Sequence, residues 1–296
     1  MAHHLQNLKA IALVTLGFAL FAFSDAILKL LAQNYTTFQT LFWTCCFTCL
    51  SLVAYSFVRY DRRVFKTTLY RWHIVRGLLM MMVNFCNIYA FLHIQLTDFY
   101  AVVFTTPLTI SVLSWLILKD RLTVHQLVAV TLGLGAVIYM CRPGAGLFNV
   151  GALVAFIGTL FFIFATLLLR SKLKHENGIL LSLNGPSILV IAIAPLIVIS
   201  GFPVPDTALD WGLFVVGGTA VGFGGITFVL GYQYASSTAV VAPFQYTQII
   251  WGALLGYFLF QEIPTIDVII GSTILIILGL YLIYSEAKTR HEISGV

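Results

Sequence analysis

The sequence predicts an all-α integral membrane protein with ten transmembrane helices, arranged as two inverted five-helix repeats. The 296-residue chain is 60% hydrophobic and only 9% charged, whereas a soluble domain carries roughly 25% charged residues. The apolar residues fall in about ten long runs that are joined by short polar connections. Such continuous runs lack the alternation of barrel strands, so helices are the expected spanning form. A single membrane domain, residues 1–296, accounts for the whole chain.

Each run approaches the roughly 20 apolar residues that a helix needs to cross the hydrocarbon core. The first run is preceded by only one basic residue, Lys9, and is long enough to span, so we expect a retained helix rather than a cleaved signal. The first repeat is expected over residues 10–141 and the second over 150–284. The predicted spans are 10–32, 38–58, 73–93, 98–118, 124–141, 150–169, 179–200, 212–234, 238–260 and 266–284.

Lysine and arginine residues predict the orientation, because cytoplasmic connections carry the excess of positive charge. With the N-terminus inside, the opposite side holds only Arg142 and, near the outer end of the first span, Lys29. We therefore expect a multi-pass protein of the cell (inner) membrane with both termini in the cytoplasm. This asymmetry also explains the net charge of +5 without a nucleic-acid partner. The basic residues of the cytoplasmic side are Arg59, Arg62, Arg63, Lys66, Arg71, Arg76, Lys119, Arg121, Arg170, Lys172, Lys174, Lys288 and Arg290.

Composition and motifs favour a protein without a cofactor, a metal site or a catalytic centre. The five cysteines all fall in apolar spans, and the seven histidines lie at span ends and in loops. The chain has no phosphate-binding loop of the Gly-x-x-x-x-Gly-Lys-Ser/Thr type, so a gradient or an exchange would have to drive transport. A membrane-embedded enzyme and a non-transporting scaffold or receptor are the alternative functions.

A weak internal repeat accompanies the predicted topology. Residues 98–123 align with 240–265, so that Asp120 pairs with Glu262 at a shift of 142 residues and Thr106 pairs with Gln248. Because each half has five spans, the second half must lie upside down relative to the first. Inverted repeats suit alternating access, in which one half copies the conformation of the other on the opposite face of the membrane.

Asp25 is the most informative candidate residue, because it lies inside the first apolar run. A charge at membrane depth is costly and usually faces a cavity, a pathway or a partner. Lys29 follows at i+4 on the same helical face and is expected to extend toward the outer surface. The two residues form either a structural ion pair or a coupling site, in which Asp25 is a cavity anion that meets a substrate amine or a proton.

Four amide side chains near the middle of predicted spans need hydrogen-bond partners, since hydrocarbon supplies none. Asn84 and Asn87 are one turn apart, and we expect them either to bond between helices or to line a cavity. Gln245 and Gln248 share one face of the 238–260 span, which favours cavity lining.

The remaining candidates for binding or gating lie in three of the predicted spans. Thr105 and Thr106 precede Pro107, which removes a backbone hydrogen bond and allows a kink that could contribute to gating. Trp251 lies beside the two glutamines along the ninth span, and Phe228 is a candidate for an apolar part of the cavity wall. Together with Asp25 and the four amides, Thr105, Thr106, Phe228 and Trp251 form the predicted substrate-binding set.

The sequence resembles the EamA-type transporters of the drug/metabolite transporter superfamily. The resemblance rests on Asp25-x-x-x-Lys29, on Arg76-Gly77, on Pro107 with the residues 118–122, and above all on the block 242–264. It implies ten helices, a central cavity lined by helices 1, 3, 4, 6, 8 and 9, and secondary transport of a small metabolite.

Within that superfamily, residues 73–79 and 283–286 are similar to those of S-adenosylmethionine uptake carriers. The chain departs from them in having Gln245 and Gln248 where those carriers place an arginine and a glutamate. The predicted function is therefore secondary transport of a zwitterion or cation, such as an amino acid, an amine or an S-adenosylmethionine-like compound. The expected partners are this small molecule, the lipid bilayer, and protons or a counter-substrate; a homodimer remains open.

Overall fold

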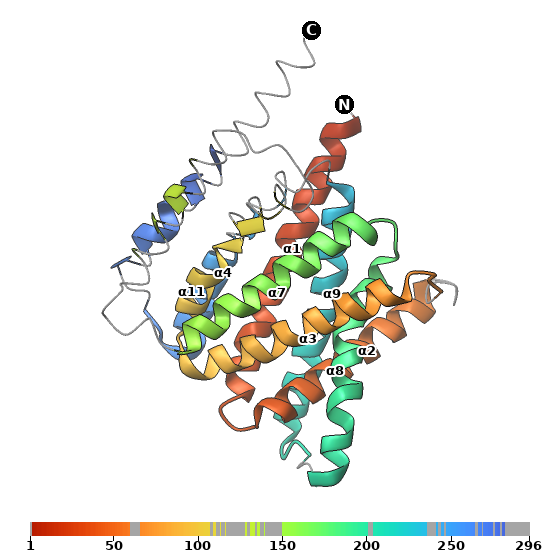
Figure 1. The fold of residues 1–296 in the computed structure, drawn as a ribbon. Coiled ribbons are helices and arrows are strands. Elements are labelled where there is room, and N and C mark those ends of the chain that lie inside the picture. Colours follow the sequence, from red (N-terminus) through yellow and green to blue (C-terminus); the bar gives the residue numbers. More distant parts are fainter. Residues whose placement is uncertain are drawn as a thin grey trace.

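The computed structural model describes residues 2–59, 66–106, 150–200, 204–235, 241, 244–245 and 247–263, together with scattered positions within 109–139 and 266–281. Figure 1 shows the arrangement of the helices in this part of the chain. They are α1 (Ala2–Leu31), α2 (Thr37–Arg59), α3 (Tyr70–His93), α4 (Leu96–Val103), α7 (Val150–Lys172), α8 (Gly178–Ser200), α9 (Ala208–Tyr234) and α11 (Thr247–Phe260).

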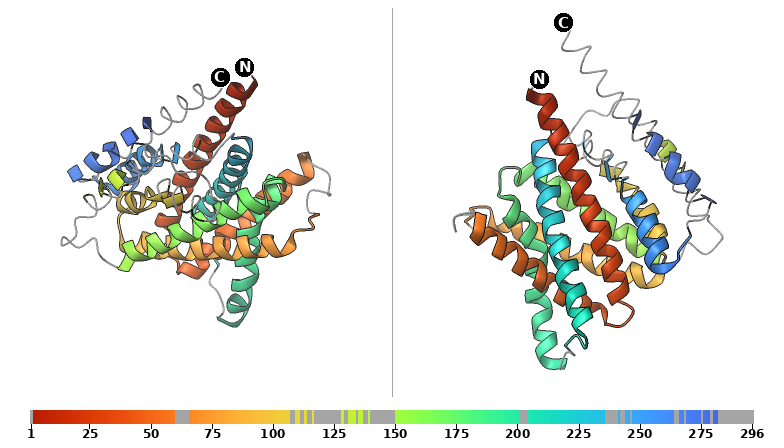
Figure 2. Two further views of the ribbon diagram at one scale, coloured as in Figure 1. Left: turned by 45° about the horizontal axis from the view of Figure 1, so that its top comes forward. Right: turned by 180° about the vertical axis from the view of Figure 1, so that it is seen from behind.

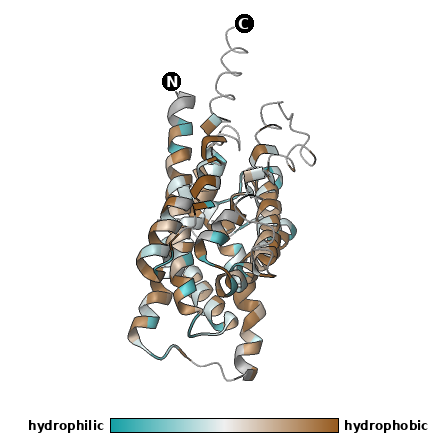
Figure 3. Ribbon diagram, turned by 90° about the vertical axis from the view of Figure 1, so that its left-hand side faces the viewer, coloured by the Kyte–Doolittle hydropathy of each residue, from teal (hydrophilic) through white to brown (hydrophobic). Residues whose placement is uncertain are grey.

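Six of these helices, namely α1, α2, α3, α7, α8 and α9, are long and apolar enough to cross a membrane. They confirm six of the predicted spans, with edges that differ by a few residues. Figure 3 shows that hydrophobic residues predominate along them. The 98–118 and 238–260 spans are represented in part by α4 and α11, whereas most of 124–141 and 266–284 lies outside the described residues, so the total of ten helices stays a prediction.

Glycines let α9 pack closely against three other helices. Figure 2 shows α1 and α9 side by side along much of their lengths. A Cβ atom on Gly224 would lie 3.0 Å from the ring of Phe21 in α1, and one on Gly218 would lie 2.6 Å from the backbone oxygen of Thr44 in α2. On another face of α9, a Cβ on Gly225 would lie 3.1 Å from the hydroxyl of Ser182 in α8. The absence of side chains at these glycines therefore allows the helices to approach closely.

The helix contacts occur in matching sets. In the two predicted repeats, α1 corresponds to α7, α2 to α8, α3 to α9 and α4 to α11. Under this correspondence, the contact α1–α9 matches α7–α3, α2–α9 matches α8–α3, and α1–α11 matches α7–α4. All six of these pairs are in contact, as are the self-matching pairs α2–α8 and α4–α11. Figure 1 shows α3 and α7 running alongside each other, as Figure 2 does for α1 and α9. The packing of the described helices is thus nearly unchanged when the two halves are exchanged.

Candidate functional site

A cavity of about 180 Å³ lies between these helices. Its walls come from α1, α3, α4, α7, α8 and α9, together with the start of α11. The resemblance implied walls from helices 1, 3, 4, 6, 8 and 9, and the structure adds the seventh span, α8. This helix reaches the cavity because Gly185 lies against Met80 of α3, and Gly225 of α9 lies against Ser182. A hydropathy pattern contains no information about such close approaches.

Seven of the nine predicted substrate-binding residues line this cavity. They come from five separate segments of the chain, namely α1, α3, the residues after α4, α9 and the start of α11. The polar members therefore face a shared space rather than surrounding lipid. The seven residues are Asp25, Asn84, Asn87, Thr106, Phe228, Gln245 and Gln248.

The two glutamines present unpaired oxygen atoms in this space. Their side chains are buried, with 1% of Gln245 and 5% of Gln248 exposed. The Oε1 atom of each accepts no hydrogen bond from the described residues. A buried polar group without a partner costs about 1–3 kcal/mol. These oxygens are thus suited to accept hydrogen bonds from a molecule in the cavity.

The two asparagines reach the cavity from the middle of α3. Asn84 donates from Nδ2 to the carbonyl oxygen of Met80 at 2.8 Å, within its own helix, so this bond is not the interhelical one that the sequence suggested as an alternative. The Oδ1 atom of Asn87 would lie 3.5 Å from a Cβ on Gly158 of α7. The same Cβ would lie 2.8 Å from the Cβ of Cys86, so the absence of a side chain at Gly158 lets α7 approach α3 beside Asn87.

Aromatic rings supply an apolar part of the cavity wall. Phe228 packs edge-on against Phe18, with ring centroids 5.6 Å apart, and lies 5.5 Å from Phe162. All three residues line the cavity and come from α9, α1 and α7. The cavity thus combines a few convergent polar groups with an aromatic surface, which is typical of small-molecule sites.

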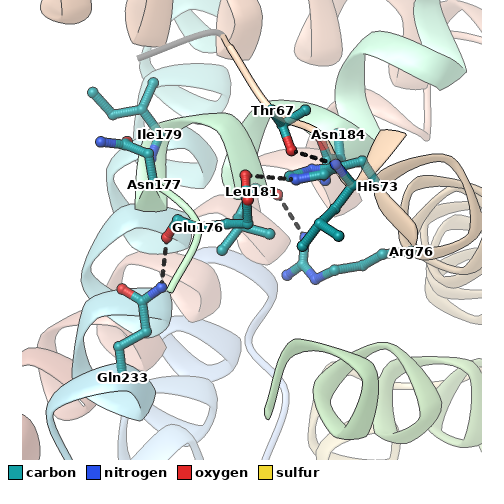
Figure 4. A network of polar contacts seen from close by, with 10 residues as sticks. Thr67, His73, Arg76, Glu176, Asn177, Ile179, Leu181, Asn184 and Gln233 are labelled. Carbon is teal, nitrogen blue, oxygen red and sulfur yellow. Dashed lines mark hydrogen bonds and ion pairs between the residues drawn. The ribbon is translucent and has the colours of Figure 1, made fainter. Parts of the chain in front are cut away.

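Arg76 is a cavity residue that the sequence reasoning missed as a site residue. It was assigned to the cytoplasmic rim, but it lines the cavity and is only 4% exposed. Its Nη1 donates to the carbonyl oxygen of Leu181 in α8 at 2.6 Å, and Figure 4 shows the guanidinium extending toward that residue. The Nε atom has no hydrogen-bond partner among the described residues. Its position three residues inside the predicted 73–93 span was the available signal.

A polar cluster lies beside the starts of α3 and α8. The Asn184 amide donates to Nδ1 of His73 at 2.8 Å, which leaves Nε2 of His73 to donate to Oε2 of Glu176 at 3.0 Å. Gln233 at the end of α9 donates to the carbonyl oxygen of Glu176 at 2.8 Å. This cluster, which we call the His73 cluster, joins α3, α8, α9 and the connection between α7 and α8 (Figure 4).

A second cluster lies where α1 and α11 end and α4 begins. Lys29 forms an ion pair with Glu262 over 2.6 Å, and the backbone N–H of Leu96 donates to the other carboxylate oxygen at 3.2 Å. We call this the Lys29 cluster. The expectation that Lys29 extends to the outer surface was wrong, because Glu262 supplies a charge partner that keeps Lys29 buried at 8% exposure. The repeat had paired Glu262 with Asp120 but did not show that it meets Lys29.

The other predicted site residues lie elsewhere. Thr105 is buried but does not line the cavity, because its hydroxyl donates back to the carbonyl of Val102 at 2.8 Å. Trp251 is 40% exposed on α11 and is not part of the cavity wall. Pro107, the predicted gating residue, lies outside the described residues.

Comparisons with known proteins agree with this arrangement. The chain is 25% identical over 272 residues to an S-adenosylmethionine uptake transporter of Rickettsia prowazekii (strain Madrid E), covering 91% of each chain. It is 26% identical over 212 residues to a pseudopaline exporter of Pseudomonas aeruginosa (strain UCBPP-PA14), covering 69% of this chain and 72% of that one. A protein of known crystal structure matches 95% of this chain and 96% of its own with a TM-score of 0.66; at 18% identity this likeness shows the fold alone.

A family model fits the first half of the chain. It describes the EamA-like transporter family and matches residues 8–142. These residues contain most of α1 and all of α2 to α4, and hence Asp25, Arg76 and the two cavity asparagines. The chain is a multi-pass membrane protein, and over residues 8–142 it is similar to the EamA-like transporter family.

Proposed function

We propose that this protein is a secondary transporter that carries a small organic zwitterion or cation by alternating access through the cavity. The observation that supports the cargo class is the convergence of acceptors: Asp25 and the unpaired Oε1 atoms of Gln245 and Gln248 line one buried space. Acceptors of this kind suit an ammonium or another N–H donor. The aromatic rings beside them suit its organic body, and rings also attract cations.

Alternating access is supported by the arrangement of the helices. The described helix contacts are nearly unchanged when residues 10–141 are exchanged with 150–284, which favours the predicted inverted repeat. One polar cluster lies one turn before the cavity-lining part of α3 and the other directly follows that of α1, and the residues that form these clusters come from both halves. In such an arrangement the cavity opens to one side at a time when one half moves against the other.

Orientation is part of the proposal. The lysine and arginine distribution favours a cytoplasmic N-terminus. The His73 cluster then faces the cytoplasm and the Lys29 cluster faces the opposite side. The S-adenosylmethionine uptake and pseudopaline export of the relatives are compatible with an amino-acid-like cargo in either direction.

The test is transport into proteoliposomes that contain the purified protein. Radiolabelled amino acids, amines and adenosyl compounds are offered at two imposed pH gradients. We expect uptake or counterflow of at least one compound, and a loss of at least tenfold in Asp25→Asn. The control is Asp206→Asn, which alters an exposed carboxylate outside the cavity. Unchanged transport with unchanged gradient dependence in Asp25→Asn would refute the role of Asp25.

A further inference from the structure

Arg76 is a buried cation whose hydrogen-bonding capacity is largely unused. A guanidinium has five N–H donors, and the bond to Leu181 uses one of its nitrogen atoms. Within the described part of the chain, no carboxylate forms an ion pair with it, and its Nε has no acceptor. Burying a charge is costly unless it is paired and hydrogen-bonded. The protein therefore maintains an unneutralised cation at the wall of its own binding cavity.

The planar guanidinium fits one type of ligand group especially well. Its N–H donors form a rigid fork that matches the two oxygens of a carboxylate, and such charge-assisted bonds are roughly twice as strong as neutral ones. We propose that Arg76 binds a carboxylate of the transported molecule, so that the cargo is a carboxylate-bearing zwitterion rather than a simple amine. This inference rests on the proposed function, because it assumes that the cavity holds the cargo.

The remaining polar groups of the cavity complement this role. Asp25 comes from α1, Gln248 from the start of α11 and Gln245 from just before α11, and they supply oxygen acceptors. Arg76 comes from α3 and supplies donors. The cavity therefore offers acceptors for an ammonium and donors for a carboxylate from different helices. A simple amine would satisfy only the first group and would leave the guanidinium buried without a counter-charge.

Arg76 also has a structural contact, the bond that ties α3 to the Leu181 carbonyl of α8. If Arg76 had only a structural role, its replacement would change the binding of every ligand to the same extent. A ligand-binding role affects only ligands that carry the carboxylate. The experiment therefore compares matched ligands that differ in this group alone.

Thermal shifts of the purified protein measure ligand binding, because a ligand that binds the folded state raises the melting temperature. The probes are free amino acids, their carboxamides and the corresponding decarboxylated amines, together with S-adenosylmethionine and its decarboxylated form. For the unmodified protein we expect an acid to bind at least tenfold more tightly than its matched carboxamide or amine. In Arg76→Gln this preference should fall to about onefold, and Arg76→Lys should retain part of it. Arg71→Gln, on an exposed position of the same helix, is the control and should keep the full preference.

The outcomes separate this inference from the proposed function. Equal binding of acids and amides to the unmodified protein, or an acid preference that survives in Arg76→Gln, overturns the carboxylate role. If amines bind and lose affinity in Asp25→Asn while acids do not bind, the proposed transporter of a cation stands and the inference fails. If no probe binds, both fail. Should Arg76→Gln not fold, a full acid preference in Arg76→Lys, which lacks the fork, overturns the inference.

Discussion

Asp25 and Arg76 are each placed one helical turn from a residue of one of the two polar clusters. Asp25 precedes Lys29 by four residues, and Arg76 follows His73 by three. In an α-helix these spacings put the paired side chains on the same face. A cargo that binds Asp25 or Arg76 can therefore influence the neighbouring cluster through a single turn of helix. This proximity provides a short physical route from binding to opening.

The Lys29–Glu262 pair gives a prediction about stability. Both side chains are largely buried, with 9% and 13% exposed. Removing one partner of a buried pair leaves an uncompensated charge and costs about 3–5 kcal/mol. We expect Lys29→Met and Glu262→Gln each to lower the melting temperature markedly. The double variant should be more stable than the sum of the two losses predicts, because neither charge is then left unpaired.

The control for this cycle is Lys66→Met, which removes an exposed lysine. Exposed substitutions usually change stability by no more than about 0.5 kcal/mol. Strict additivity of Lys29→Met and Glu262→Gln would show that the two side chains do not interact in the membrane-embedded protein.

At the scale of the helix, α9 shows how small residues set the positions of the cavity walls. Its glycines face α1, α2 and α8, and Thr48 of α2 donates from its hydroxyl to the carbonyl oxygen of Gly218 at 2.8 Å. Helices in lipid associate through close packing and such bonds, since apolar contacts alone give no advantage over lipid tails. The distance between α9 and its neighbours therefore depends on the absence of side chains at a few positions.

Gly218→Ala tests this dependence. The added Cβ would lie 2.6 Å from the Thr44 carbonyl oxygen and 2.8 Å from the Cβ of Phe47, so α9 and α2 must move apart. Overpacking of this kind costs about 1–3 kcal/mol. We expect a lower melting temperature and weaker transport. Gly212→Ala, in the same helix, meets nothing within 4 Å and should be neutral or slightly stabilising; equal losses in the two variants would contradict the packing argument.

The sequence predicted the helices themselves better than their contacts. The predicted span 73–93 corresponds to the helix Tyr70–His93 in the structure, and the predicted span 212–234 corresponds to Ala208–Tyr234. The earlier start of α9 reflects Thr207, whose side chain accepts a hydrogen bond from the Asp210 backbone and caps the helix. Hydropathy finds apolar length but not caps, because a cap consists of polar residues outside the apolar run.

Partners distant in the sequence were harder to predict. Six polar residues of the predicted site line the cavity, because a polar side chain in an apolar run is costly where it faces lipid. Arg76 was missed, since a basic residue near a span end satisfies the orientation rule whether it faces water or the cavity. The Lys29–Glu262 pair was missed because its residues are 233 positions apart and only folding brings them together.

At the scale of the whole molecule, the two polar clusters lie just beyond the cavity wall. His73 precedes Arg76, the first cavity-lining residue of α3, by one turn, and Lys29 directly follows Leu28, the last cavity-lining residue of α1. The His73 cluster joins α3, α8 and α9. The Lys29 cluster joins α1, α4 and Glu262, which follows α11. Both are formed together in this structure, so hydrogen-bonded contacts hold the helices at both places. Alternating access requires that one cluster can break while the other persists.

Site-directed cysteine labelling would measure whether one cluster can break while the other persists. A cysteine in place of Val83, which lines the cavity from α3, is introduced after the native cysteines have been replaced by serine or alanine. A membrane-impermeant maleimide is then applied to oriented vesicles from either side. Glu176→Ala removes the carboxylate that binds His73, and Glu262→Ala removes the one that binds Lys29. We expect Glu176→Ala to raise the labelling rate severalfold from the cytoplasmic side only, and Glu262→Ala to raise it from the opposite side only.

The argument depends on the side specificity rather than on the size of either effect. A ligand or a mutation can shift a two-state equilibrium only by stabilising one state relative to the other. If the clusters hold alternative states, cargo protects the cysteine from labelling in both variants, and each variant changes accessibility on its own side. Equal increases on both sides would mean that the substitutions loosen the whole helix assembly, and the two clusters would then be structural contacts instead of gates.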